Sequence, residues 1–269
     1  MELFDNFDID EGRGKIEAMN IKYMKFGDGP RTMVILPGLS LRPVSATPQG
    51  VISAYEIFTK DFTVYLFDYR ENPDEGQTIE DMANDVADAL RELDLDEVYL
   101  YGVSMGGMVG QVLTIKHPEL VKKLVLCSTV SRITENERMK EWLLLAKRKE
   151  IIRLVDSFVR SVYSPGFYER SIDIAFSMYK DLTDEDMRDL IVRVEAAEHF
   201  DVTNRLKEIR IPVFYLGCLN DQIFTTEQMM ETVNGIGCES YFYDNCSHAI
   251  YDEEADIKDR IYDFFMKED

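Results

Sequence analysis

Short, continuous apolar runs recur along the chain, and polar or glycine-containing segments separate them. A run of this kind is typical of a strand that is buried on both faces of a parallel sheet. Such runs are Thr32–Leu36, Thr63–Phe67, Val98–Tyr101, Leu124–Cys127 and Val213–Leu216. A mixed apolar and polar segment, Ile16–Phe26, ends in a Gly-Asp-Gly-Pro turn and predicts a further strand or one arm of a hairpin.

Helical periodicity occupies the intervals between these runs. Apolar residues recur every three or four positions after Thr78, which is suited to cap the start of a helix that continues through Leu93. Further helices are predicted over Met105–Lys116 and Ala255–Met266. The alternation of strands and helices predicts an α/β fold, in which helices cover both faces of a mostly parallel sheet.

The alternation stops between Ser131 and Asn204, where no run predicts a strand. Helical patterns occur there instead, around Glu137–Val162, Tyr168–Tyr179 and Asp184–His199. A helical cap inserted into an α/β core would produce this pattern. We therefore predict that residues 1–130 and 205–269 form the core and that residues 131–204 form the cap.

Composition and charge narrow the class of protein. The chain has 269 residues, of which 45% are hydrophobic and 30% are charged, and its formal net charge is −21. This apolar content is too high for a disordered protein. The negative charge repels nucleic-acid phosphates and anionic lipid surfaces, so we expect neither nucleic acid nor a membrane as a partner.

The sequence also carries information about location. The first residues, Met1–Asp5, contain neither the basic region nor the apolar region of a secretory signal. No apolar run approaches the ~18 residues that a membrane span needs. The four cysteines form no Cys-x-x-Cys pair and are expected to be free thiols. These observations predict a cytoplasmic protein.

The segment Gly102-Val103-Ser104-Met105-Gly106, followed by Gly107, fits the pattern Gly-x-Ser-x-Gly. It lies where a predicted strand ends and a predicted helix begins. A sharp turn at this point holds the serine in a strained conformation and requires small residues at positions 102 and 106. Ser104 is therefore the candidate nucleophile, presented at the carboxyl end of the sheet.

A serine hydroxyl is a weak nucleophile and needs a base. The chain has three histidines. His117 lies at the end of the helix that follows Ser104, and His199 lies within the predicted cap, so both are better explained by helix ending or packing. His248 lies in a polar loop before the last helix, at the sheet edge that carries Ser104, and is the candidate base.

The histidine in turn needs a carboxylate that fixes its tautomer. Asp221 follows the run Val213–Leu216 and a short turn, which places an acid just past the carboxyl end of a strand. Asp244 and Asp252 flank His248 and are alternatives. We take Asp221 as the candidate acid.

An attacked carbonyl also needs donors that hold its oxyanion. One donor would be the backbone N–H of Met105, the residue after the nucleophile. The loop after Thr32–Leu36 reads Pro37-Gly38-Leu39-Ser40 and would supply the second donor. We assign it to the N–H of Leu39, because Gly38 permits the backbone to turn inward.

Taken together, these segments resemble the α/β-hydrolase superfamily over nearly the whole chain. The matching segments are Leu36–Leu39, Phe67–Arg70, Gly102–Gly107, Asn220-Asp221 and Ser247-His248, in the family's order of nucleophile, acid and base. The resemblance implies an eight-stranded, mostly parallel sheet, a helical cap after the sixth strand, and no cofactor or metal. The chain departs from many members at Pro37, where a histidine is common, and at Glu71, where a glycine is common.

The predicted cap is rich in large apolar and aromatic side chains. They are Met139, Trp142, Leu143, Phe158, Tyr163, Phe167, Phe176, Met178 and Tyr179. They could form the roof of an apolar pocket, although packing between helices is the simpler explanation for most of them. Arg42, just past the oxyanion loop, could meet an anionic group of a substrate or lie on the surface.

The predicted function is hydrolysis of an ester-type bond in a small, largely apolar molecule, through an acyl-enzyme on Ser104. Other serine chemistry on the same fold stays open: thioesterase, lactonase, carbon–carbon bond hydrolase or acyltransferase. A protein that binds a ligand without turning it over is the alternative from another class.

Overall fold

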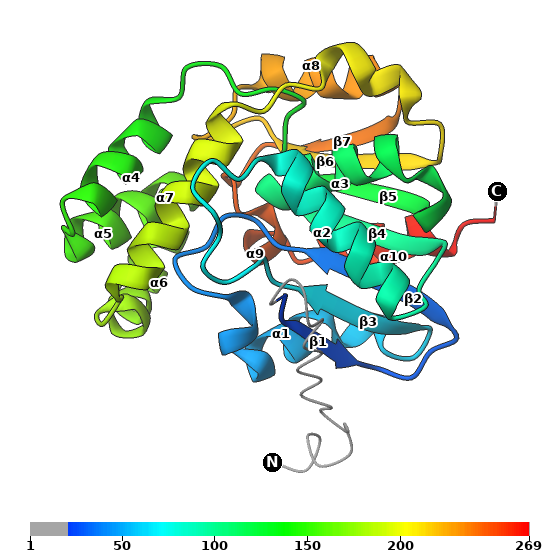
Figure 1. Cartoon of the computed structure of the whole chain (residues 1–269), viewed down its shortest axis with the longest axis horizontal. Helices are drawn as coiled ribbons and strands as arrows, with labels where there is room; N and C mark the ends of the chain where they lie inside the picture. Colours follow the sequence, from blue (N-terminus) through cyan, green and yellow to red (C-terminus); the bar gives the residue numbers. More distant parts are fainter. Residues whose placement is uncertain (1–20, 269) are drawn as a thin grey trace.

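A single sheet forms the centre of the molecule in residues 21–268, the part of the chain that the computed structural model describes. Its strands are β1 (Tyr23–Phe26), β2 (Arg31–Leu36), β3 (Phe62–Phe67), β4 (Val98–Val103), β5 (Val121–Cys127), β6 (Val213–Cys218) and β7 (Glu239–Tyr243). Their order in space is β1-β3-β2-β4-β5-β6-β7 (Figure 1). Only β1 runs antiparallel to its neighbour, so the α/β class with a mostly parallel sheet is confirmed.

The sheet in residues 21–268 has seven strands, one fewer than the eight that the family resemblance implied. Only β1 precedes β2 in this part of the chain, and β1 pairs with β3 alone. Of the predicted strand Ile16–Phe26, the structure has Tyr23–Phe26 as β1. Residues 16–20 of that prediction lie outside the described residues.

The central strands are apolar because both of their faces are covered. Every residue of β4 is buried, and the last four residues of β2 are buried as well. In the register of the sheet, Leu36 of β2 lies beside Gly102 of β4, and Val103 of β4 lies beside Cys127 of β5. The carboxyl ends of these three strands are therefore level with one another, and the loops that follow them meet at one edge.

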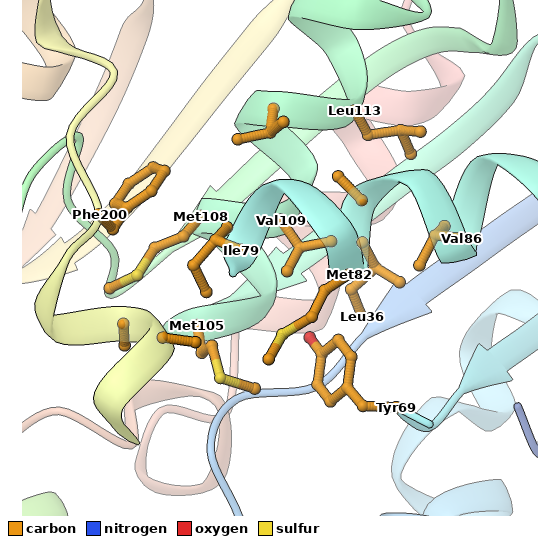
Figure 2. Packing of buried hydrophobic residues seen from close by; sticks show 14 of the residues in the cluster. Leu36, Tyr69, Ile79, Met82, Val86, Met105, Met108, Val109, Leu113 and Phe200 are labelled. Carbon is orange, nitrogen blue, oxygen red and sulfur yellow. The ribbon is translucent and has the colours of Figure 1, made fainter. Parts of the chain in front are cut away.

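Helices cover both faces of the sheet. One face carries α2 (Ile79–Glu92), α3 (Met105–Lys116) and α8 (Thr226–Ile236). The other face carries α1 (Pro48–Tyr55), α9 (Ile250–Glu253) and α10 (Ile257–Met266). Figure 2 shows how α2 and α3 pack: Ile79 and Met82 of α2 lie close to Val109 of α3 in one apolar cluster.

The predicted N-cap of α2 is confirmed. The Thr78 hydroxyl accepts a hydrogen bond from the Asp81 N–H (3.1 Å), and the Asp81 carboxylate accepts one from the Thr78 N–H (2.9 Å). This reciprocal arrangement satisfies two backbone donors that the first turn of a helix leaves free. The helix therefore begins at the residue that the sequence indicated.

Four helices lie between β5 and β6 in the chain and gather on the left in Figure 1. They are α4 (Glu137–Lys147), α5 (Ile151–Val162), α6 (Pro165–Tyr179) and α7 (Asp184–Glu198). A β-bridge between Arg132 and Asp201 joins the two ends of this segment. The all-helical pattern is as predicted from the sequence, and the division into core and cap stays a prediction.

The pattern read as one helical stretch over Glu137–Val162 is two helices. The chain turns between α4 and α5, where Lys149 has a positive φ of 57°. The Lys149 N–H donates to the Ala146 carbonyl (2.9 Å), which closes the last turn of α4. A positive φ is unfavourable for lysine and cannot be read from its side-chain chemistry.

The remaining elements are short. Single turns of 3-10 helix occur at Val44–Ala46, Glu56–Phe58 and Pro118–Leu120, and a longer 3-10 helix spans Thr203–Glu208. Among residues 21–268, no helix combines the length and the apolar character needed to cross a bilayer. The four cysteines are free thiols.

Candidate active site

Ser104 occupies the turn between β4 and α3 in a strained conformation. Its φ is 51° and its ψ is −116°, a combination that residues with a side chain rarely adopt. Two hydrogen bonds hold it: the Ser104 N–H donates to the Cys127 carbonyl (2.8 Å), and the Thr129 hydroxyl donates to the Ser104 carbonyl (2.7 Å). The surrounding backbone therefore fixes the direction of the serine hydroxyl.

Close backbone contacts explain the glycines of the motif. A Cβ on Gly106 would lie 2.1 Å from the Leu36 carbonyl oxygen, and a Cβ on Gly102 would lie 2.6 Å from the Gly106 carbonyl oxygen. A Cβ on Gly107 would lie 2.6 Å from the side chain of Thr129. Gly102 and Gly106 are glycine because β2, β4 and α3 approach more closely than a side chain allows, and Gly107 is glycine because the side chain of Thr129, just after β5, lies against it.

His248 lies beside Ser104 although 144 positions separate them in the chain. Its Nε2 is 2.9 Å from the Ser104 Oγ, and its Nδ1 is 2.7 Å from the Asp221 Oδ2. The ring packs edge-on against Phe224, with centroids 5.4 Å apart. The imidazole is thus held on three sides, and only 4% of its side chain is exposed.

Asp221 lies three residues beyond the end of β6, and its side chain is completely buried. Its second oxygen, Oδ1, accepts hydrogen bonds from the N–H groups of Ile223 (2.7 Å) and Phe224 (3.0 Å). The carboxylate is therefore oriented by its own loop and presents Oδ2 to His248. The structure brings together Ser104, His248 and Asp221, the three side chains that the sequence selected.

The alternative residues lie elsewhere. His117 ends α3 beside Arg91, and burial, reinforced by that guanidinium, lowers the pKa of its imidazole from 6.5. The Nδ1 of His199 lies 2.7 Å from the Glu195 carbonyl at the end of α7. The two alternative acids are engaged elsewhere or exposed. Asp252 accepts a hydrogen bond from the Tyr163 hydroxyl, and the residue Asp244 is exposed. Within residues 21–268, none of these side chains forms a hydrogen bond with the Ser104 hydroxyl, which pairs with His248.

The loop after β2 lies close to Ser104. A Cβ on Gly38 would lie 3.2 Å from the Cβ of Ser104, and Leu39 lines the same pocket as the serine. The N–H groups of Leu39 and Met105 donate no hydrogen bond to any residue in 21–268. Met105 has no carbonyl partner because it is the first residue of α3. The assignment of these two N–H groups to an oxyanion stays a prediction.

Neighbouring side chains brace this loop. The Tyr69 hydroxyl donates to the Pro37 carbonyl (2.7 Å), so the loop is anchored although a histidine is absent at position 37. The buried carboxylate of Asp68 accepts hydrogen bonds from the N–H groups of Val44 (2.8 Å) and Ser45 (3.1 Å). Burial nevertheless raises the pKa of Asp68 above its usual 3.8.

A pocket lies between the carboxyl ends of the strands and helices α4, α5 and α7. Its lining residues are Gly38, Leu39, Ser104, Met105, Met108, Met139, Trp142, Phe158, Val162, Ala197, Ile223, Phe224, His248 and Tyr251. None of these residues is Lys, Arg, Asp or Glu. Burial raises the pKa of the Tyr251 hydroxyl well above 10, so this group stays neutral. The pocket therefore suits an uncharged, mostly apolar group.

Three of the nine large apolar and aromatic residues noted in residues 131–204 line this pocket. Met139, Trp142 and Phe158 line it. Tyr163 stacks on Phe167 with ring centroids 4.7 Å apart, and 40% of Met178 is exposed. Packing thus explains Tyr163 and Phe167, and the three lining residues form a wall of the pocket.

Arg42 lies at the surface, as one of its two interpretations expected, with 28% of its side chain exposed. Its guanidinium donates to the Met178 carbonyl (2.9 Å), to the Asp181 carbonyl (2.7 Å) and to the Asp181 carboxylate (3.0 Å). The Asp186 carboxylate lies 3.7 Å from its Nε. Arg42 therefore links the segment after the oxyanion loop to the end of α6 and the start of α7.

Sequence reasoning missed four residues that shape the site. They are Tyr69, Thr129, Phe224 and Tyr251. Tyr251 lies three residues after His248, and Phe224 lies three residues after Asp221. A search for side chains one turn beyond each candidate residue could have found these two, whereas the contacts of Thr129 and Tyr69 depend on the sheet register.

The chain is similar to known proteins over most of its length. The family model described as alpha/beta hydrolase fold matches residues 31–255. The chain is 25% identical over 210 residues to 3-oxoadipate enol-lactonase 2 of Acinetobacter baylyi, covering 76% of this chain and 77% of that protein. It is 24% identical over 237 residues to a protein assigned as the carbamate hydrolase RutD of Rhizobium rhizogenes, covering 82% and 86%.

Solved structures share the fold. The enol-lactonase from Burkholderia xenovorans LB400 superimposes with a TM-score of 0.80 at 22% identity, over 92% of this chain and 96% of that chain. The esterase EaEST from Exiguobacterium antarcticum superimposes with a TM-score of 0.78 at 18% identity, over 94% and 97%. At these identities the likeness concerns the fold alone.

Proposed function

The chain belongs to the α/β-hydrolase family and is a hydrolase of ester-type bonds, and we propose that it works as a serine hydrolase on a small, largely apolar substrate. The observation that carries the proposal is the hydrogen-bonded series Ser104–His248–Asp221. A serine becomes nucleophilic when a correctly oriented base can take its proton.

The first step transfers the acyl group to Ser104. Asp221 accepts the Nδ1–H of His248, which leaves Nε2 free to accept the Ser104 proton. The serine oxygen bonds to the ester carbonyl carbon, and the N–H groups of Met105 and Leu39 hold the negative oxygen. His248 then returns the proton to the leaving alkoxide, and an alcohol departs.

The second step regenerates the enzyme. His248 takes a proton from water, the resulting hydroxide adds to the acyl carbonyl carbon, and the same two N–H groups hold the oxyanion. The bond to Ser104 breaks as His248 donates the proton back to the serine oxygen. The products are a carboxylic acid and the free enzyme, and no cofactor enters this scheme.

The pocket supports an uncharged substrate. Its lining residues include no cationic side chain that would offset a carboxylate, and Arg42 is engaged by Asp181 and Asp186. A lactone is the second candidate, because a relative of 25% identity is named an enol-lactonase. Hydrolysis of a lactone opens an internal ester by the same two steps.

The test is ester hydrolysis by the wild-type protein and by Ser104→Ala. We expect turnover of p-nitrophenyl butyrate by the wild type and a loss of at least about 10⁴-fold in kcat in the variant. Comparable activity in Ser104→Ala would contradict the proposal, as would the absence of turnover of esters and lactones by the wild type. A γ-lactone assayed in parallel separates the two substrate classes.

A further inference from the structure

Trp142 carries a buried hydrogen-bond donor that has no partner. The residue lies on α4, lines the pocket beside Ser104, and is 3% exposed. Its indole Nε1 is closed to solvent and forms no hydrogen bond within residues 21–268. The ring packs instead against Phe158, with centroids 4.9 Å apart. A buried N–H without an acceptor is unfavourable, because it has lost its hydrogen bond to water and has formed none within the protein.

No polar side chain of the pocket lining accepts a hydrogen bond from this donor. The polar side chains of the lining are Ser104, His248 and Tyr251, and the first two are hydrogen-bonded to each other. The lining also contains the thioether sulfurs of Met105, Met108 and Met139, which accept hydrogen bonds only weakly. Their unbranched side chains can change rotamer, so the pocket can adapt its shape to a ligand.

We propose that Trp142 recognises a second oxygen of the substrate, a ketone, ether or ester oxygen in the acyl part, separate from the carbonyl that Ser104 attacks. The substrate class is then an oxygenated acyl ester or a lactone that carries such an oxygen, and a plain alkanoyl ester is the poorer substrate. This inference rests on the proposed function. It makes Trp142 a determinant of specificity, since a buried donor discriminates against a ligand that leaves it unpaired.

Matched esters test the inference. We would compare kcat/KM for p-nitrophenyl hexanoate with that for its 4-oxo and 5-oxo derivatives, in the wild type and in Trp142→Phe. For each protein we take the ratio of kcat/KM for the oxo ester to kcat/KM for the plain ester. Dividing the ratio of the wild type by that of the variant cancels the difference in intrinsic reactivity between the esters. We expect a quotient of about five to ten for at least one oxo ester.

Phe158→Leu is the control, because it disturbs the packing of the indole and removes no donor. It should lower all rates together and leave the oxo-to-plain ratio unchanged. A quotient near one for Trp142→Phe with both oxo esters would overturn the inference and leave the proposed function intact. Failure of the wild type to hydrolyse any of the esters would instead contradict the proposed function.

A second measurement avoids substitution of the indole. Trp142 is the only tryptophan of the chain, so its fluorescence reports on this one N–H. Methyl hexanoate and methyl 5-oxohexanoate, together with the 4-oxo ester, would be titrated into Ser104→Ala, which binds without turnover. We expect a shift of the emission to longer wavelength with an oxo ester and none with methyl hexanoate. The same emission with all three esters would overturn the inference.

Discussion

At the scale of single residues, the site depends on orientation more than on residue type. Ser104 is held at φ 51° by a backbone that leaves no room for side chains at Gly102 and Gly106. His248 is held between Ser104 and Asp221 by two hydrogen bonds of 2.9 and 2.7 Å. In the proposed mechanism, this fixed arrangement makes the serine hydroxyl a nucleophile, which it is not in water.

Replacing Asp221 with asparagine tests the orientation of the imidazole. Asp221→Asn keeps the shape of the side chain, but an amide can stabilise the wrong tautomer of His248. We expect kcat for p-nitrophenyl butyrate to fall by about 10⁴-fold with an unchanged circular dichroism spectrum. Asp244→Asn is the matched control, because Asp244 is exposed and should tolerate the change. Equal losses in the two variants would contradict the assignment of the acid.

The three side chains of the site could be found from sequence because their chemistry and spacing are distinctive. The role of Trp142 could not, since an indole on a helix face usually packs. Its missing partner depends on which groups surround Nε1 after folding. The contact of the Thr129 hydroxyl with the Ser104 carbonyl likewise depends on the alignment of β4 and β5, which the chain does not encode locally.

At the scale of elements, sequence patterns predict what is apolar and periodic. The inner strands could be predicted because they are apolar runs, and α2 because its apolar residues recur with helical spacing. β7 was missed because Glu239, Ser240 and Tyr241 are exposed at the edge of the sheet, so the strand lacks an apolar run. The break between α4 and α5 could not be predicted, because Lys149 has a positive φ and lysine is not a residue that indicates this conformation.

Arg42 gives a prediction about the helices above the pocket. Its guanidinium is the donor for two backbone carbonyls, those of Met178 and Asp181, and lies against two carboxylates. Arg42→Gln should therefore loosen the connection between α6 and α7. We expect faster hydrogen exchange in residues 178–186, measured by mass spectrometry. Arg205→Gln is the control, since Arg205 pairs with Glu208 on its own exposed turn. Unchanged exchange in Arg42→Gln would contradict this role.

His117 gives a prediction about pH and stability. Burial and Arg91 lower the pKa of this imidazole in the folded protein below its usual 6.5. Between the folded and unfolded pKa values the unfolded chain binds more protons, so His117 contributes stability above pH 6.5 that is lost as the pH falls.

Urea unfolding at a series of pH values, from neutral to mildly acidic, would measure this contribution. The free energy of unfolding of the wild type should fall more steeply with decreasing pH than that of His117→Gln. His199→Gln serves as the control, because the exposed His199 lies at the end of α7 with its ring against a backbone carbonyl. Parallel curves for the wild type and His117→Gln would refute the stated direction of the pKa shift.

At the scale of the whole molecule, the net charge of −21 opposes compaction. Screening should therefore stabilise the fold. Raising the salt concentration from about 0.01 M to about 0.15 M shortens the Debye length from about 30 Å to about 8 Å. We expect the midpoint of thermal unfolding to rise over this range of NaCl. A midpoint that falls with salt would show that attractive ion pairs outweigh the general repulsion.

The proposed function depends on the activation of Ser104 by His248. The most direct measurement is labelling with a fluorophosphonate, which reacts with activated serines, followed by mass spectrometry of the peptides. We expect a single adduct on Ser104, its loss in Ser104→Ala, and a much slower reaction in a folded His248→Ala protein. Labelling at another residue, or an equal rate in His248→Ala, would contradict the activation of Ser104 by His248.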